Sequence, residues 1–222
     1  MRTRTTTAAA TALTAAVALL LTGCGGSDSS GGSDSKTSDE IAGADTGPGS
    51  AAPSESAAGD GIERPEIKLP SDVENVFEGG TTGDEAKDAV LADNERMINS
   101  IDEAITVDAG KHPALKFYSK GDALLAAATY IKSFYDSGTS WAGVTRYYDR
   151  DVTLNGTTSA TVTYCGDETK SYSKDRKTKQ VKRTPGDADD YVSYNARMEK
   201  NAQGVWQTVK VSSERGAERC RP

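Results

Sequence analysis

The chain has 222 residues, with 26 basic and 33 acidic side chains, one histidine and a formal net charge of −7. Nucleic-acid binding needs a concentrated basic surface, so this acidic balance argues against that class of protein. One histidine and three cysteines leave too few ligands for the usual zinc sites. We therefore expect no metal, no cofactor and no nucleic-acid partner.

The first 23 residues are typical of a secretory signal peptide. Arg2 and Arg4 precede an apolar run from Ala8 to Leu21. That run has about 14 residues, whereas a helix that spans a membrane needs roughly 20. A permanent transmembrane helix is therefore the weaker interpretation.

The four residues that close this run, Leu-Thr-Gly-Cys at 21–24, resemble the bacterial lipobox. The resemblance implies cleavage before Cys24 and a diacylglycerol thioether on its sulfur. Two or three acyl chains form a firm anchor, because each buried CH₂ contributes about 0.8 kcal/mol. We expect the protein on the outer face of the cytoplasmic membrane. The alternative is an ordinary signal peptide with a chance cysteine.

Residues 24–62 have the composition of a disordered tether. Gly, Ser, Ala, Asp, Thr and Pro dominate, no aromatic residue occurs, and Ile41 is the only large apolar residue before Ile62. Such a segment cannot bury enough surface to offset its loss of conformational entropy. Its mean reach is about 35 Å, so it separates the anchor from one domain, residues 63–222.

Two helices are predicted at the start of this domain. The first covers 82–106, with Thr82 and Glu85 as a capping box. Its apolar stripe follows helical spacing: Val90, Leu91, Asn94, Met97, Ile98, Ile101 and Ile105. The second covers 121–136 and ends near Gly138. Its predicted buried side consists of Leu124, Ala127, Ala128, Ile131, Phe134 and Tyr135.

From residue 143 onward the apolar period changes to two, which indicates strands. Segments 143–154 and 158–165 flank Asn155-Gly156, a pair suited to a tight hairpin. Further strands are predicted at 177–184, 191–200 and 204–213, while Pro65 and Pro70 keep residues 64–70 extended. The fold class is α+β, with N-terminal helices packed on a curved antiparallel sheet of four to six strands.

The cysteines allow one disulfide. If Cys24 carries lipid, only Cys165 and Cys220 remain, in a compartment where disulfides persist. We expect them to pair, the alternative being two separate thiols.

Three segments of the domain carry a family resemblance: RPEIKLPSDVENVF, PALKFYSKGDALLAAATYIKSF and GVWQTVKVSSERGAERC. Together they resemble small actinobacterial lipoproteins with a nuclear-transport-factor-2-like domain, a cone-shaped α+β fold. The resemblance covers residues 64–220 and implies location and shape. Enzymes on this fold, such as ketosteroid isomerase, place acidic, tyrosine or histidine groups in the cone. No such set can be carried over here residue by residue, so no catalytic residue is assigned.

Several groups of residues are candidate sites. Six aromatic residues could line a cone pocket, although packing is the commoner role of such side chains: Tyr130, Trp141, Tyr147, Tyr164, Tyr194 and Trp206. His112 fits a solvated loop better than a general base, and Asp187, Asp189 and Asp190 fit a solvated turn better than a calcium site. The basic run 170–183 fits either a solvated edge hairpin or a surface for anionic lipids or polymers.

The function that we infer from the sequence is a non-enzymatic binding module, monomeric, lipid-anchored and extracytoplasmic. Its partner would be an envelope protein, an anionic polymer or a small ligand. The alternative is a small-molecule enzyme or carrier that uses the cone pocket. The alternative depends on fold analogy alone, which is a weak basis for assigning function.

Overall fold

The computed structural model describes residues 60–108 and 110–222. The predicted signal peptide, Cys24 and residues 25–59 of the predicted tether lie outside the described residues. None of the described helices is both long enough and apolar enough to cross a membrane.

The described part of the chain is α+β, as predicted. The α-helices are α1 (Glu85–Thr106), α2 (Pro113–Tyr118) and α3 (Gly121–Asp136). The strands are β1 (Val73–Phe77), β2 (Thr139–Leu154), β3 (Ser159–Asp175), β4 (Val181–Lys182), β5 (Tyr191–Lys200) and β6 (Trp206–Arg215). Two short 3₁₀ helices, η1 (Ala188–Asp190) and η2 (Glu218–Cys220), flank β5 and β6.

The six strands form one sheet in the order β1-β2-β3-β5-β6, with the short β4 paired to the end of β3. The long meander β2-β3-β5-β6 is antiparallel, as predicted. The sheet as a whole is mixed, because β1 pairs parallel with β2 from Val73↔Gly143 to Phe77↔Tyr147. Strand β1 was not predicted from the sequence, because its five residues are too few for an alternation of apolar and polar positions to show.

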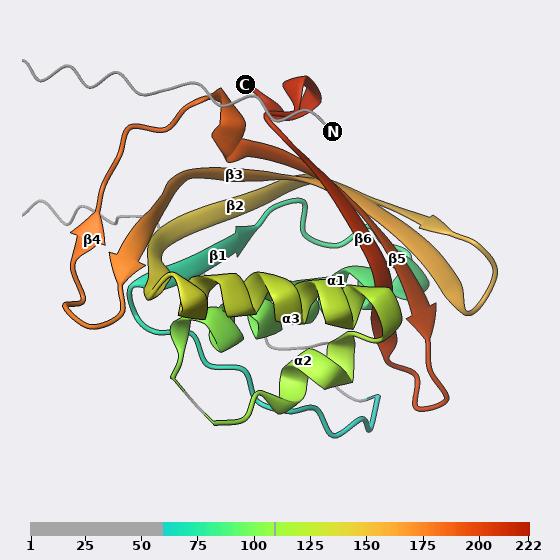
Figure 1. Ribbon diagram of the computed structural model, residues 1–222. Coiled ribbons are helices and arrows are strands. Elements are labelled where there is room, and N and C mark those ends of the chain that lie inside the picture. The colour runs from blue at the N-terminus through green and yellow to red at the C-terminus, as the bar shows by residue number, and fades with distance from the viewer. Residues whose placement is uncertain (1–59, 109) are drawn as a thin grey trace, which may run out of the picture. The chain divides into compact units, whose positions relative to one another are not determined.

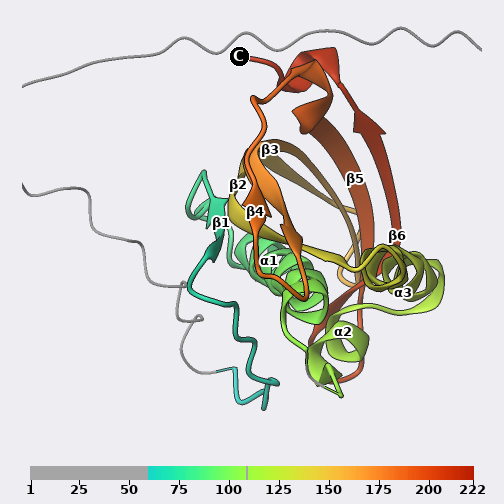
Figure 2. The same ribbon diagram turned by 60° about the vertical axis from the view of Figure 1, so that its left-hand side comes forward.

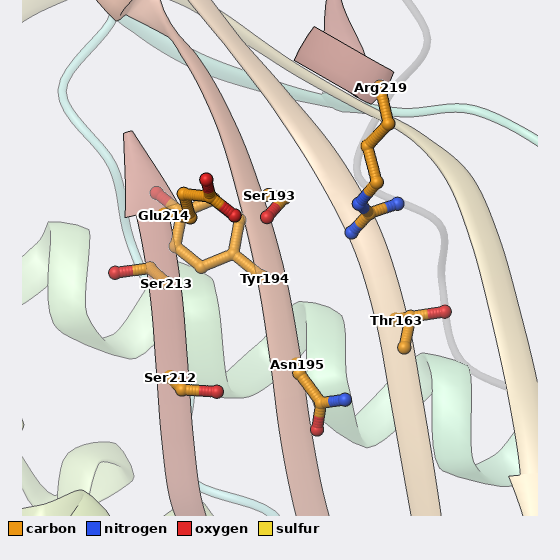
Figure 3. A pocket seen from close by; sticks show the side chains of 8 residues that line it. All are labelled: Thr163, Ser193, Tyr194, Asn195, Ser212, Ser213, Glu214 and Arg219. Carbon is orange, nitrogen blue, oxygen red and sulfur yellow. The ribbon is translucent and has the colours of Figure 1, made fainter. Parts of the chain in front are cut away.

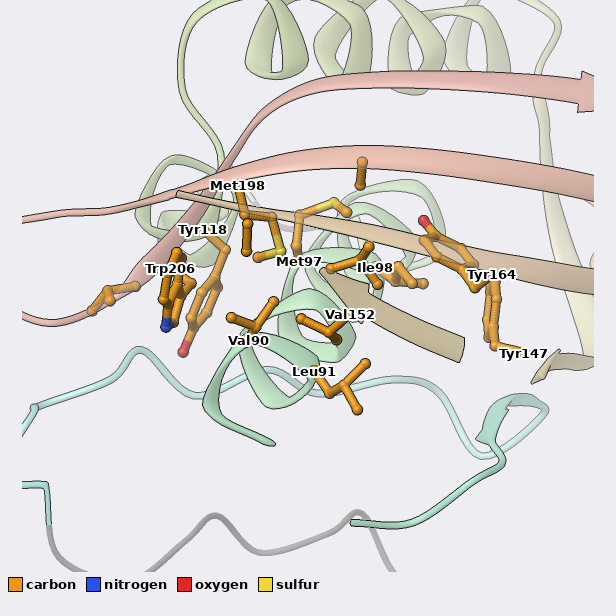
Figure 4. Packing of buried hydrophobic residues seen from close by; sticks show 14 of the residues in the cluster. Val90, Leu91, Met97, Ile98, Tyr118, Tyr147, Val152, Tyr164, Met198 and Trp206 are labelled. Atoms are coloured by element: carbon orange, nitrogen blue, oxygen red, sulfur yellow. The ribbon is translucent and has the colours of Figure 1, made fainter. Parts of the chain in front are cut away.

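Helix α1 lies across the concave side of the curved sheet, with α2 and α3 beside it (Figures 1 and 2). Its predicted stripe is confirmed, because Val90, Met97 and Ile105 are each at most 3% exposed. The stripe packs on inward-facing strand residues such as Val162 and Met198, both fully buried (Figure 4). A smaller cluster of Val73, Ile105 and Trp141 lies toward the other end of α1.

Local details of three elements differ from the prediction. Helix α1 begins at Glu85 and is capped by Asp84, whose side chain accepts hydrogen bonds from two backbone N–H groups, while Thr82 bonds to Asp88 instead. The β2–β3 turn is wider than a two-residue turn, because Leu154 pairs with Ala160. Strand β4 has only two residues, Val181 and Lys182, of the eight predicted at 177–184, because the lysines and the arginine around them favour solvent over a longer pairing.

Helix α3 is more exposed than its sequence predicts. Ala123 and Ala127 are its buried residues, whereas Ala128 and Tyr135 of the predicted buried side are exposed. The reason is that α1 already covers the concave face of the sheet. Helix α3 is left to pack along a narrow line on β6 and on the end of α1.

Candidate functional site

The six candidate pocket aromatics are placed in different surroundings. Three belong to the main hydrophobic cluster and are at most 8% exposed: Tyr147, Tyr164 and Trp206 (Figure 4). Tyr194 packs against this cluster and Trp141 belongs to the smaller one. Tyr130, on α3, is 51% exposed. Packing is therefore the main role of five of the six.

Four aromatic rings form a continuous row on the inner face of the sheet, one from each of β1, β2, β3 and β5. Neighbouring ring centroids are 5.0 Å apart for Phe77–Tyr147, 6.0 Å for Tyr147–Tyr164 and 4.8 Å for Tyr164–Tyr194. Gly166 makes room for them, since a Cβ there would lie 3.1 Å from the Tyr194 ring. The four rings thus pack one against the next across this face of the sheet.

A buried carboxylate, Asp102 of α1, lies between the two hydrophobic clusters. Its Oδ2 accepts a hydrogen bond from Asn75 Nδ2 at 2.7 Å, and its Oδ1 accepts one from Trp141 Nε1 at 3.2 Å. Asn75 Nδ2 also donates to Asn99 Oδ1 at 2.8 Å. Among the described residues no basic side chain forms an ion pair with Asp102. Burial therefore dominates and raises its pKa from 3.8 to about 7, against the opposing effect of the two donors.

A second polar group lies on the same side of the sheet, around Glu168 of β3. Its Oε1 accepts a hydrogen bond from the Tyr194 hydroxyl at 3.2 Å, and its Oε2 lies 2.8 Å from Arg215 Nη2. Burial, with the negative charges of Glu168 and Asp102, raises the pKa of Tyr130 to about 12.

Asp102 and the buried tyrosines on the inner side of the sheet are groups that can take part in proton transfer. A carboxyl group with a pKa near neutral pH can donate or accept a proton. The phenols stay protonated, because burial raises the pKa of Tyr147 and Tyr194 well above 10.0. Such phenols act as hydrogen-bond donors toward a developing negative charge.

The outer, convex face of the sheet carries a shallow, open groove of about 480 Å³. Outward-facing polar residues line it: Thr163, Ser193, Asn195, Ser212, Glu214 and Arg219 (Figure 3). Tyr194 and Ser213 also border the groove, although the Tyr194 ring belongs to the row on the inner face. These residues come from β3, β5, β6 and η2. Arg219 extends from η2 toward Thr163 across the groove (Figure 3). Hydroxyl, amide and charged groups on this scale suit a polar ligand or a polar stretch of a partner.

The wall of the groove is held by the predicted disulfide, which is confirmed. Cys165 and Cys220 are joined with their Cα atoms 5.5 Å apart, and both are fully buried. The Tyr148 hydroxyl donates to the Cys220 carbonyl, and the Ala217 N–H donates to the Tyr191 carbonyl at 2.9 Å. The C-terminal segment is thereby fixed on β3 and β5.

Two functional candidates were missed from the sequence although a signal existed for each. Asp102 follows Ile101 at the border of the α1 stripe, where charged residues of an amphipathic helix ordinarily face solvent. Glu168 continues the inward alternation of Tyr164 and Gly166 along β3. In both cases the signal is a carboxylate at the edge of an apolar face. Asp102 borders the apolar stripe of α1, and Glu168 follows Tyr164 and Gly166 on the inward side of β3.

The remaining candidates are His112 and the turn that contains Asp187 and Asp190. His112 is not solvated: its side chain is 15% exposed and its Nδ1 lies 3.7 Å from Glu103 Oε2. The prediction of a solvated histidine is wrong, because α1 supplies a carboxylate that covers the loop. Asp187 and Asp190 form the capping box of η1, which agrees with the predicted turn.

No protein-family model matches the chain, and no curated protein sequence matches it. Several solved structures are similar to part of it, among them the following two. A ketosteroid isomerase-like protein from Erwinia carotovora atroseptica SCRI1043 is 15% identical, covers 60% of this chain and 97% of that chain, and has a TM-score of 0.42. The intermembrane space region of the chloroplast protein ARC6 is 14% identical, covers 58% and 97%, and has a TM-score of 0.39. The described part of this chain has an α+β architecture of its own, with three α-helices and one six-stranded sheet.

Proposed function

We propose that this protein is a lipid-anchored envelope protein on the outer face of the cytoplasmic membrane, whose domain is a non-enzymatic binding module. The lipobox-like residues 21–24 and the tether composition support the anchoring. We also propose that the domain is of the nuclear-transport-factor-2-like type, on the resemblance of residues 64–220 and the helices on one side of a curved sheet.

The groove on the outer face is the observation that carries the binding role. Much of the inner face is packed with the two hydrophobic clusters and the row of rings. The outer groove is open and offers hydroxyl, amide and guanidinium groups within about 480 Å³. It therefore suits a polar partner or a hydroxyl-rich ligand.

The anchoring is tested by replacing Cys24 with alanine. The wild-type chain should partition with the membrane fraction, and mass spectrometry of its N-terminus should show acylated Cys24. The variant should be released, because no thioether can form. Retention of Cys24→Ala in the membrane fraction would contradict the lipid anchor.

The groove is tested by a photo-crosslinking amino acid placed at Asn195 in the living cell. A crosslinked product is expected there and not at Thr129, an exposed residue on α3. The yield of this crosslinked product should also fall when Arg219, which lines the groove, is changed to glutamate. Equal crosslinking from both positions would remove the groove as the binding surface.

A second candidate function, a small-molecule enzyme or carrier, is favoured by one observation. Asp102 has a pKa near neutral pH and lies on the same side as the Tyr194–Glu168–Arg215 group. Its test is the fluorescence of anilinonaphthalene sulfonate, an apolar anionic probe. Enhancement that is lost in Arg215→Ala would support an inner site, whereas no enhancement by the wild-type chain would exclude one for ligands of this kind.

A further inference from the structure

A strongly basic surface of the described residues is the arm formed by the end of β3, its turn and β4, residues 170–183. The arm contains seven basic residues and a single acidic one, Asp175. It projects from the end of the sheet opposite the β2–β3 turn (Figure 1). We name this segment the basic arm.

Part of the basic arm is fixed to the body of the domain. Lys174 Nζ lies 2.6 Å from Asp72 Oδ2, and Arg176 Nη1 lies 2.6 Å from Asp108 Oδ1. The Arg176 guanidinium also covers the Tyr135 ring at 3.7 Å and donates to the Ile105 carbonyl. These contacts hold the arm in one orientation, which limits the entropy lost when its surface binds something.

The other basic residues of the arm face solvent. Four of them have no carboxylate within 4.0 Å among the described residues: Lys170, Lys177, Lys182 and Arg183. Seven basic side chains thus face only the three carboxylates of Asp72, Asp108 and Asp175, which leaves an excess of four positive charges. This excess lies at one end of a domain that belongs to an acidic chain.

We propose that the basic arm docks on the anionic headgroups of the membrane to which the protein is tethered. The inference rests on the proposed lipid anchor, which would keep the arm within a tether reach of about 35 Å from the bilayer. The turn carries Lys177, Thr178 and Lys179 and no apolar residue. Such a tip suits a flat charged surface better than a protein interface, whose centre needs apolar or aromatic anchors.

Docking through the arm would set the orientation of the whole domain. A single acyl chain binds weakly by itself, and a cluster of basic residues is the usual second signal that strengthens it. Here the basic arm would be the second signal, and it would act on a domain that acyl chains already anchor. Its consequence would be a domain held close to the bilayer by the end that carries β4.

The test uses the chain from residue 24 onward with Cys24 replaced by serine, so that no acyl chain contributes. Cosedimentation is measured with vesicles of phosphatidylglycerol and phosphatidylcholine in equal parts, and with vesicles of phosphatidylcholine alone. We expect binding to the anionic vesicles only. Binding should fall on raising the salt from about 0.1 M to about 1 M, because the screening length shortens from about 10 Å to about 3 Å.

Two matched triple variants distinguish binding through the basic arm from a general effect of net charge. The triple change Lys170→Ala, Lys177→Ala and Lys182→Ala should lower vesicle affinity about a hundredfold, at about fivefold for each lysine. The control changes Lys111, Lys116 and Lys210 to alanine, which removes the same charge from other exposed positions. The control should keep most of the affinity, and circular dichroism should show both variants folded.

Three outcomes would overturn the proposal: no binding to anionic vesicles, equal losses in the two triple variants, or binding to soluble polyphosphate without binding to vesicles. The anchor is tested apart from this, through acylation of Cys24. A chain that is acylated but has an inert arm refutes the docking alone. A chain that is not acylated refutes the anchor whatever the vesicles show.

Discussion

Single residues explain why the inside of this domain is more polar than its apolar pattern suggests. Asp102 is enclosed between two hydrophobic clusters and keeps only neutral hydrogen-bond donors, from Asn75 and Trp141. A buried carboxylate without a counter-ion favours its protonated form. Asp102 is therefore the residue at which pH should act on this fold.

We predict that Asp102 makes the domain less stable as the pH rises. Its folded-state pKa, about 7, lies above the ordinary 3.8, so its protonated form stabilises the fold fully below about pH 4. That contribution is lost as the pH rises through 7, and it corresponds to roughly 4 kcal/mol. Urea denaturation across this range should show the decline in the wild-type chain.

The variant Asp102→Asn is the control for this decline. Asparagine does not titrate, so the free energy of unfolding of the variant should change much less between these pH values. Its absolute stability will be lower at acidic pH, because the amide cannot accept both hydrogen bonds. Parallel pH profiles for the two chains would show that Asp102 titrates normally.

Gly143 of β2 pairs with Val73, the first residue of β1. Its φ is +120°, and a Cβ there would lie 2.0 Å from the Lys170 carbonyl oxygen. Gly143→Ala should therefore lower the free energy of unfolding by about 3 kcal/mol or more. Gly110→Ala, where a Cβ would meet nothing within 4 Å, should change it by less than about 0.5 kcal/mol. Equal effects of the two changes would contradict this.

Among the elements, the C-terminal segment depends most on one bond. Helix η2 packs on the outer face of β3 and β5, and the disulfide joins it to Cys165. Hydrogen bonds from Tyr148 and Ala217 add to this attachment. The polar groove keeps its Arg219 wall only while the segment is docked.

We predict that removing the disulfide destabilises the domain and opens the groove. The bridged residues are 55 apart in sequence, and closing a loop of that length contributes about 4 kcal/mol in the chain-entropy model. The double variant Cys165→Ser, Cys220→Ser should lose about that much in urea denaturation. Its last residues should also gain rapid amide exchange. An unchanged midpoint would show that packing alone holds the segment.

Much of the element pattern could be predicted from the sequence. The helical spacing of Val90 to Ile105 and the strand alternation of Ala160, Val162 and Tyr164 appear in the structure as buried faces. Helix α2 and strand β1 were missed, because six and five residues are too few for a period to show. The exposure of α3 was also unpredictable, since its apolar side competes with α1 for the same face.

At the scale of the whole molecule, the folded domain contains its own stabilising contacts. Both hydrophobic clusters and the disulfide lie between residues 62 and 220. Arg64, near its beginning, forms ion pairs with Asp60 and Asp93.

We predict that deleting residues 1–59 leaves the stability of the domain unchanged within about 0.5 kcal/mol. The comparison is urea denaturation of the shortened chain and of the chain from residue 24 onward with Cys24→Ser. Midpoint and slope should agree, because a Gly/Ser-rich tether buries no apolar surface. A clear loss of stability on deletion would show that the predicted tether packs on the domain.

The sequence by itself determined the properties that depend on local composition and spacing. They include the α+β class, the main helix, the antiparallel meander and the single available disulfide, together with the expectations of an anchor and a tether. The tertiary structure alone decided which charged residues are buried, where β1 joins the sheet and which side of the sheet is left open. These depend on contacts between residues far apart in the chain, such as Asp102 with Trp141 and Lys174 with Asp72, and a local pattern can mark at most one partner of such a contact.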